Sequence, residues 1–135
     1  MKQQSDKLTA YYYRAATINK ELFFDNQMYR LLRHAVQNDK STYVLYADHG
    51  YSGMDSNRPA FAELLRQVKA NRIRKVIVTD ASRISRNTPD FYAFAKQAKK
   101  RGTRIETVDG ESLCEEAEMY EKLSDVLTLK GGESR

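Results

Sequence analysis

Cysteine, histidine, proline and tryptophan are scarce in this sequence of 135 residues, which holds one Cys, two His, two Pro and no Trp. The lone Cys114 excludes an internal disulfide framework and fits a reducing cytoplasm. His34 and His49 lie far apart in the chain, and no Cys/His cluster accompanies them. We therefore expect neither a metal site nor another cofactor.

Long apolar runs and glycine-rich phosphate loops are also missing. No stretch is long enough to span a bilayer, and the amino-terminal residues lack the apolar core of a signal peptide. Neither Gly-x-Gly-x-x-Gly nor a Walker motif occurs, which argues against the common nucleotide-binding loops. The length fits one domain covering residues 1–135, which we expect in the cytoplasm without a membrane partner.

Positive charge is concentrated in the middle of the chain. Residues 58–104 hold thirteen Lys/Arg against three Asp/Glu, a local charge of +10, whereas residues 105–135 hold three against nine, or −6. A basic middle third suggests a polyanion such as nucleic acid as partner, although solvated helix faces would give the same count.

The apolar pattern alternates between strands and helices. Strands are expected at 8–16, 43–46, 76–78 and 103–108, and helices at 20–37, from 59 to 68, at 89–101 and at 112–128. Short connections and right-handed crossovers then predict an α/β fold, a mostly parallel sheet of about four strands with helices on both faces. Residues 131–132, a Gly pair, end the last helix, so we expect no separate DNA-binding domain in this chain.

Several local expectations follow from this pattern. Alternation along the first strand puts Tyr12, Arg14 and Ala16 on one side and Tyr11 and Tyr13 on the other. A Thr88 hydroxyl is expected to cap the helix that begins at Pro89, and Gly102 to end it. The apolar residues of the last helix belong either to the core, which the pattern favours, or to a dimer seam: Leu113, Tyr120, Leu123 and Leu127.

Four arginines fall at strand ends or loops on one rim of the predicted sheet. Arg83 and Arg86 follow the strand at 76–78, where ligands bind in open α/β sheets. Arg58 begins a helix whose backbone N–H groups favour an anion. Arg14 ends the first strand and needs an anionic ligand or, alternatively, a structural salt bridge to an acid such as Asp48 or Asp80. Guanidinium groups grip phosphate in a bidentate manner, so we interpret the loop as a phosphodiester site.

In order along the chain, several motifs resemble those of the serine recombinase catalytic domain, which resolvases, invertases and large serine integrases share. They are Tyr12-Tyr13-Arg14-Ala15-Ala16, Gln27 early in the first helix, Asp48-His49-Gly50-Tyr51-Ser52-Gly53, Asn57-Arg58-Pro59-Ala60-Phe61 and Asp80-Ala81-Ser82-Arg83-Ile84-Ser85-Arg86-Asn87. The resemblance runs from about residue 12 to residue 110.

The resemblance implies a mechanism without metal. A serine attacks the DNA phosphodiester, forming a 5′-phosphoserine link and freeing a 3′-hydroxyl, while arginines clamp the phosphate. Carried over to this sequence, the phosphate ligands are Arg14, Arg58, Arg83 and Arg86, and Gln27 shapes the pocket. The implied partners are DNA and further recombinase protomers, as a dimer or tetramer of this chain or together with an active protomer.

The sequence departs from the family at the nucleophile position, where Ala16 stands in place of serine. Thr17 is one residue further on and is expected to point to the other face. The leading interpretation is a site-specific recombinase catalytic domain that is inactive in this form. The alternatives are a dead relative that acts as a DNA-binding or regulatory module, and an α/β domain that binds a phosphorylated metabolite.

Overall fold

The strand β1 (Leu8–Ala15) lies inside a four-stranded parallel sheet of order β2-β1-β3-β4, as the computed structural model shows. The other strands are β2 (Tyr43–His49), β3 (Ile73–Val78) and β4 (Arg104–Thr107). The structure describes residues 7–16, 25–38, 42–52, 57–115, 118–119, 122–123 and 126. This confirms the predicted parallel α/β fold.

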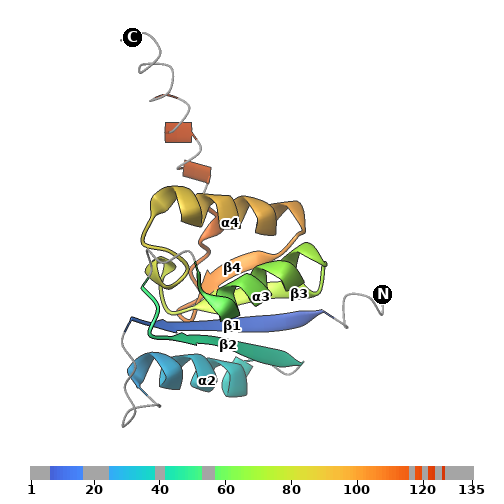
Figure 1. Ribbon diagram of the computed structural model, residues 1–135. Helices are drawn as coiled ribbons and strands as arrows, with labels where there is room; N and C mark the ends of the chain where they lie inside the picture. The colour runs from blue at the N-terminus through green and yellow to red at the C-terminus, as the bar shows by residue number, and fades with distance from the viewer. Residues whose placement is uncertain are drawn as a thin grey trace.

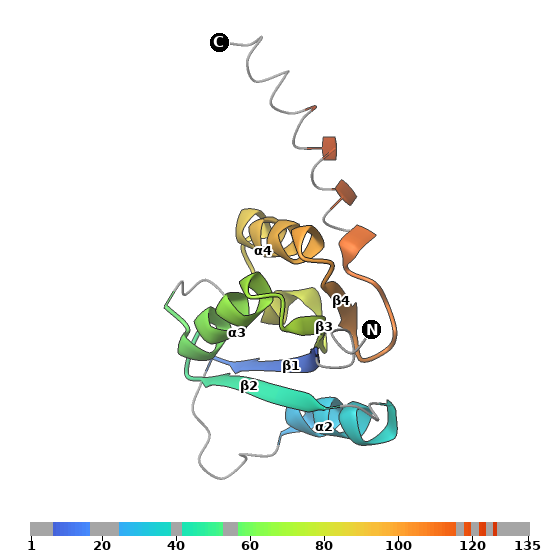
Figure 2. The same cartoon turned by 90° about the vertical axis from the view of Figure 1, so that its right-hand side faces the viewer.

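The helices α2 (Asn26–Asn38), α3 (Pro59–Lys69) and α4 (Thr88–Lys100) cover both faces of the sheet (Figure 1). α2 packs on one face, where its buried Met28 and Leu31 meet Tyr11 and Tyr13. α3 and α4 lie on the opposite face (Figure 2), over a core that includes Tyr12. The expected alternation along the first strand is therefore confirmed, because tyrosines from alternate positions enter different halves of the core.

Two strands are longer than the apolar pattern indicates. β2 continues through Asp48 and His49, beyond the predicted strand end at residue 46. The backbones of these two residues pair with Arg14 and Ala15, so the sheet accepts them despite their weak strand propensity. β3 begins at Ile73, three residues before the predicted start.

Two helix starts differ from the predictions. α2 begins at Asn26, after Asp25, whose carboxylate accepts a hydrogen bond from the amide of Met28 at 2.9 Å; residues 20–24 of the predicted helix lie outside the described part. At α4, the capping side chain belongs to Asn87 and not to Thr88, because the Asn87 side chain accepts from the amide of Asp90 at 3.2 Å. Gly102 follows α4 with φ +72°, as its role at the helix end predicts.

The segment after β4 differs in part from the predicted helix at 112–128. Ser112 forms an isolated antiparallel bridge with Glu106, and helical residues begin at Cys114. Leu113 is buried in the core as expected, but Leu123 is 53% exposed, so its assignment to the core is wrong. The predicted core positions Tyr120 and Leu127 lie outside the described residues.

Candidate functional site

Three of the four predicted arginines meet at the carboxyl ends of β1 and β3. The sheet order reverses direction between these two strands, since the chain leaves β1 toward β2 and returns on the other side as β3. Such a switch point is where parallel α/β sheets place their ligands. Arg14 lies on β1, Arg58 precedes α3, and Arg83 ends the short helix η1 (Ala81–Arg83) after β3.

Arg14 is 1% exposed, and backbone carbonyls hold it. Its Nε donates to the carbonyl of Arg83 at 3.1 Å, Nη1 to that of Tyr51 at 3.2 Å and Nη2 to that of Ser82 at 2.8 Å. Burial first, and then the positive charges of Arg83, Arg58 and Arg86, lower the pKa of Arg14. Within the described residues Arg14 has no carboxylate partner, so the alternative of a salt bridge to Asp48 or Asp80 is not what the structure contains.

Arg58 is 5% exposed and, like Arg14, donates to backbone carbonyls of the loop that follows β3. Its Nη1 donates to the carbonyl of Arg83 at 3.2 Å, and its Nη2 donates to that of Ile84 at 2.5 Å. The guanidinium carbon lies 4.3 Å from the centre of the Phe61 ring, which supports it from one side. A single carbonyl, that of Arg83, thus receives both Arg14 and Arg58.

Arg83 completes the group from the loop itself. Its Nη1 donates to the carbonyl of Arg14 at 3.1 Å, which ties the end of β1 to η1. The Nε atom is buried and makes no hydrogen bond within the described part of the chain, although the carboxylate of Asp80 lies 3.7 Å away. Arg86 is exposed, and its charge is close enough to lower the pKa of Arg14. We call Arg14, Arg58, Arg83 and Arg86 the arginine cluster.

A buried tyrosine and a buried acid orient Arg58. The hydroxyl of Tyr12 accepts from Arg58 Nη1 at 3.1 Å and donates to Oδ2 of Asp48 at 2.6 Å. Asp48 also accepts from the amides of Ala60 and Phe61, at 2.9 and 3.0 Å, and so caps α3. The unfavourable position of Arg58 at a helix start is thereby compensated, because a carboxylate satisfies that helix end.

Tyr12 stays protonated in this network. Burial, followed by the hydrogen bond to Asp48, raises the pKa of Tyr12, while the charge of Arg58 lowers it by less. Tyr12 was not predicted as a site residue, and Asp48 was predicted only as a possible partner of Arg14. Their positions in two of the motifs could have indicated a role in the site. Tyr12 lies two residues before Arg14, and Asp48 begins a glycine-containing turn.

Gln27 holds the backbone of Arg14. The pairing between β1 and β3 ends at Tyr11, whereas β1 continues to Ala15. Beyond that point the side chain of Gln27 accepts from the amide of Arg14 at 3.2 Å and donates to its carbonyl at 3.0 Å. Gln27 therefore acts on Arg14 through the main chain.

Ala16 follows directly on the end of β1 and is exposed. The preceding carbonyl, that of Ala15, accepts from the amides of Gly50 and Tyr51 at 2.7 and 3.1 Å, which fixes the strand end. Thr17 lies outside the described residues. The methyl group of Ala16 offers no nucleophile or base.

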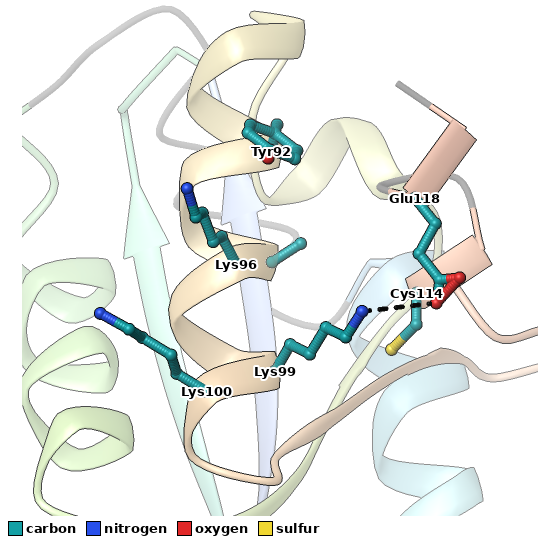
Figure 3. Close-up of a pocket in the computed structure, with 7 residues that line it drawn as sticks. Tyr92, Lys96, Lys99, Lys100, Cys114 and Glu118 are labelled. Carbon is teal, nitrogen blue, oxygen red and sulfur yellow. Dashed lines mark ion pairs between the residues drawn. The ribbon is translucent and has the colours of Figure 1, made fainter. Parts of the chain in front are cut away.

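A second basic region lies apart from the arginine cluster, in a cavity of about 300 Å³ between α4 and the segment after β4. Figure 3 shows Lys96, Lys99 and Lys100 along α4, with Lys99 pointing toward Glu118. The side chain of Cys114 lies beside this pair. We call this region the lysine cavity.

Within the described ranges, no group of three or more His, Cys, Asp or Glu side chains could hold a metal ion. In the same ranges, no helix combines the length and apolarity needed to cross a bilayer.

The fold and the site define a parallel α/β domain with an arginine-lined carboxyl edge. The chain belongs to the family described as the resolvase N-terminal domain, whose model matches residues 9–130. Comparison with curated protein sequences gives no match.

Solved structures support the fold. The chain is similar to the N-terminal catalytic domain of TP901-1 integrase, with 22% identity, a TM-score of 0.73 and coverage of 96% of this chain and 100% of the other. It is also similar to a resolvase family site-specific recombinase from Streptococcus pneumoniae, at 22% identity and a TM-score of 0.63. This match covers 95% of this chain and 97% of the other. The C-terminal catalytic domain of ISC1926 TnpA, an IS607-like serine recombinase, is similar at 19% identity and a TM-score of 0.66. The match covers 93% of this chain and 84% of the other. The recombinase catalytic-domain class expected from the motifs is thus confirmed.

Proposed function

We propose that the arginine cluster binds a backbone phosphate of DNA, and that Ala16 occupies the position of the attacking serine. The chain is then a serine site-specific recombinase catalytic domain that holds DNA without cutting it in this form. The observation that carries the proposal is that Arg14 and Arg58 are buried and held by backbone carbonyls. Carbonyl dipoles fix the geometry of a guanidinium but leave its full charge available to an anion.

The electrostatics suit phosphoryl transfer. A phosphate in the transition state spreads negative charge over its oxygens, and fixed cations stabilise that charge without reorganising. In the proposal Arg14, Arg58, Arg83 and Arg86 contact the phosphate, and Gln27 positions Arg14. The guanidinium groups supply the positive charge that metal ions supply elsewhere, so the proposal requires no cofactor.

The test restores the missing oxygen. Ala16→Ser is incubated with supercoiled DNA, and a covalent adduct at the 5′ end is sought. The serine oxygen bonds to phosphorus, the bond from phosphorus to the 3′ oxygen breaks, and the serine proton ends on the released 3′-hydroxyl. We expect an adduct with Ala16→Ser alone and none with the unchanged chain.

Two controls sharpen this test. Ala15→Ser places a hydroxyl on the neighbouring residue, on the other side of β1, and should give no adduct. Adding Arg83→Ala to Ala16→Ser should abolish the adduct, because one phosphate ligand is lost. An adduct with the unchanged chain, or its absence with Ala16→Ser, would overturn the assignment of Ala16.

A second candidate function is a regulatory module, favoured by the assembled arginine cluster beside a methyl group. Such a module would bind DNA in the cytoplasm and join active recombinase protomers. Copurification with an active recombinase, and DNA binding by the unchanged chain, would support this role over that of a disarmed enzyme. Self-association of this chain without binding to active recombinase protomers would contradict this role.

A further inference from the structure

Arg14 lies in a part of β1 that pairs with only one neighbouring strand. β3 pairs with β1 as far as Tyr11, whereas β2 pairs with it up to Ala15. The side chain of Gln27 bonds both backbone groups of Arg14, since it accepts from the N–H at 3.2 Å and donates to the carbonyl at 3.0 Å. The position of the Arg14 backbone therefore depends on the position of Gln27.

The first turn of α2 determines where Gln27 lies. Gln27 is the second residue of this helix and is 8% exposed. Asp25 precedes the helix and closes its first turn: Oδ1 accepts from the amide of Met28 at 2.9 Å, and the carbonyl accepts from the amide of Tyr29 at 2.9 Å. A carboxylate in this position satisfies amides that the helix itself leaves unpaired. A displacement of Asp25 is thus transmitted to Gln27.

A hydroxyl from β1 holds the other oxygen of Asp25. The hydroxyl of Tyr13 donates to Oδ2 of Asp25 at 2.5 Å, and Tyr13 is 1% exposed. Burial, and then the hydrogen bond to Asp25, raise the pKa of Tyr13, so its hydroxyl is a donor at neutral pH. A hydrogen bond to an ionised carboxylate is stronger than one between neutral groups. Tyr13 therefore fixes the residue that begins α2.

We infer that Tyr13 is a positioning residue for Arg14 and acts through the first turn of α2. The contacts form a closed path: the Tyr13 hydroxyl fixes Asp25, Asp25 fixes the first turn, and Gln27 in that turn fixes the backbone of the next residue of β1. The inference rests on the proposed function, in which Arg14 is a phosphate ligand. Tyr13 does not contact the phosphate, because its side chain packs on the α2 side of the sheet.

Tyr11 offers a matched control on the same face of the same strand. It is also 1% exposed, and its hydroxyl forms a hydrogen bond with Nδ1 of His34 on α2 at 2.8 Å. Tyr11 lies where β1 pairs with both neighbouring strands, and His34 lies beyond the first turn of the helix. Tyr11→Phe and Tyr13→Phe each remove one hydroxyl contact on this side of the sheet, but only Tyr13→Phe breaks the path to Arg14.

Hydrogen exchange at the Arg14 amide measures this effect directly, because that amide donates to Gln27. Exchange is followed by NMR in each variant and expressed relative to the amides of β3, so that a general loss of stability cancels. We expect Tyr13→Phe to raise the relative exchange rate about tenfold and Tyr11→Phe to change it less than about twofold. Equal relative rates in the two variants would overturn the inference.

Asp25→Ala tests the route between the two residues. We expect it to raise the relative exchange rate of the Arg14 amide at least as much as Tyr13→Phe does. Adding Tyr13→Phe to Asp25→Ala should then have no further effect, because both changes break the same path. Effects that multiply would show that Tyr13 influences Arg14 without Asp25, and would contradict the inference.

Adduct formation separates this inference from the proposed function. In the Ala16→Ser chain with saturating supercoiled DNA, Tyr13→Phe should slow the adduct about tenfold and Tyr11→Phe less than about twofold, because a misplaced ligand stabilises the transition state less well. An unchanged rate with Tyr13→Phe would overturn the positioning role, even with faster exchange at Arg14. Absence of an adduct from Ala16→Ser itself would overturn the proposed function, whereas exchange at the Arg14 amide still decides whether Tyr13 holds that residue.

Discussion

The arginine cluster and the lysine cavity are both rich in positive charge, but they are built differently. In the cluster, Arg14 and Arg58 are almost fully buried, and carbonyl groups hold them in one orientation. In the cavity, the side chain of Lys99 is 69% exposed and faces Glu118 at 3.8 Å, whose side chain is 52% exposed. Local charge alone would rank the two regions together, whereas burial and hydrogen bonding identify the cluster as preorganised for an anion.

The largest expected contrast concerns the acids of the two regions. Asp48→Ala removes the acceptor for the Tyr12 hydroxyl and for two amides of α3, so we expect a loss of about 3 kcal/mol in the free energy of unfolding. Glu118→Ala breaks only an exposed ion pair and should cost less than about 0.5 kcal/mol. Urea denaturation of both variants measures the difference. Similar losses would show that the two regions are not distinct.

The second contrast concerns two exposed cations. Arg86→Ala should weaken DNA binding about tenfold and reduce the slope of log affinity against log salt by about 0.9, because a phosphate contact is lost. Lys100→Ala removes the same charge from the lysine cavity and should change affinity about twofold at most. Titrations at several salt concentrations check both variants. Equal effects would mean that overall charge and not the cluster governs binding.

The third contrast separates helix stability from site charge. Asn87 caps α4 next to Arg86, and Asn87→Ala should lower the free energy of unfolding by about 1 kcal/mol. Because no guanidinium changes, DNA affinity at a temperature where the chain is folded should stay within about twofold of the original. A loss of affinity as large as that of Arg86→Ala would show that the helix start itself contributes to binding.

The smallest effect appears only at alkaline pH. Burial and the hydrogen bond to Asp25 raise the pKa of Tyr13 from 10.0 to about 12. The folded chain thus keeps a proton that the unfolded chain releases, so this contribution to stability is complete below pH 10 and disappears as pH rises toward 12. Tyr13→Phe should flatten the fall in stability over this range, measured by denaturation at pH 9 to 12. An unchanged profile would assign the fall to other groups.

The sequence predicted the parts of the fold that depend on apolar periodicity. The alternation of Tyr11, Tyr12 and Tyr13 and the order of strands and helices followed from spacing alone. The ends were harder, because Asp48 and His49 are strand residues only through backbone pairing with β1. Asn87 and Thr88 are both good caps, and only coordinates show which side chain reaches the amide of Asp90.

The arginines of the site were predicted from the sequence, but the groups that hold them in place were not. Four arginines at one sheet edge followed from their positions at strand ends and loops of a parallel sheet, and Arg14, Arg58 and Arg83 do converge. What holds them could not be read from the sequence, because the acceptors are mostly backbone carbonyls, which every residue possesses. The bridge from Asp48 through Tyr12 to Arg58 also depends on a register between β1 and β2 that no local pattern specifies.

The inner position of β1 has a consequence for biosynthesis. β1 leaves the ribosome before both of its neighbours, yet its partner β3 ends at Val78, late in the chain. During translation β1 must wait for about sixty further residues before β3, which pairs with its residues 8–11, covers its second edge. A nascent chain stalled in that interval exposes an aromatic strand edge, which makes this domain a candidate client for chaperones that bind such edges.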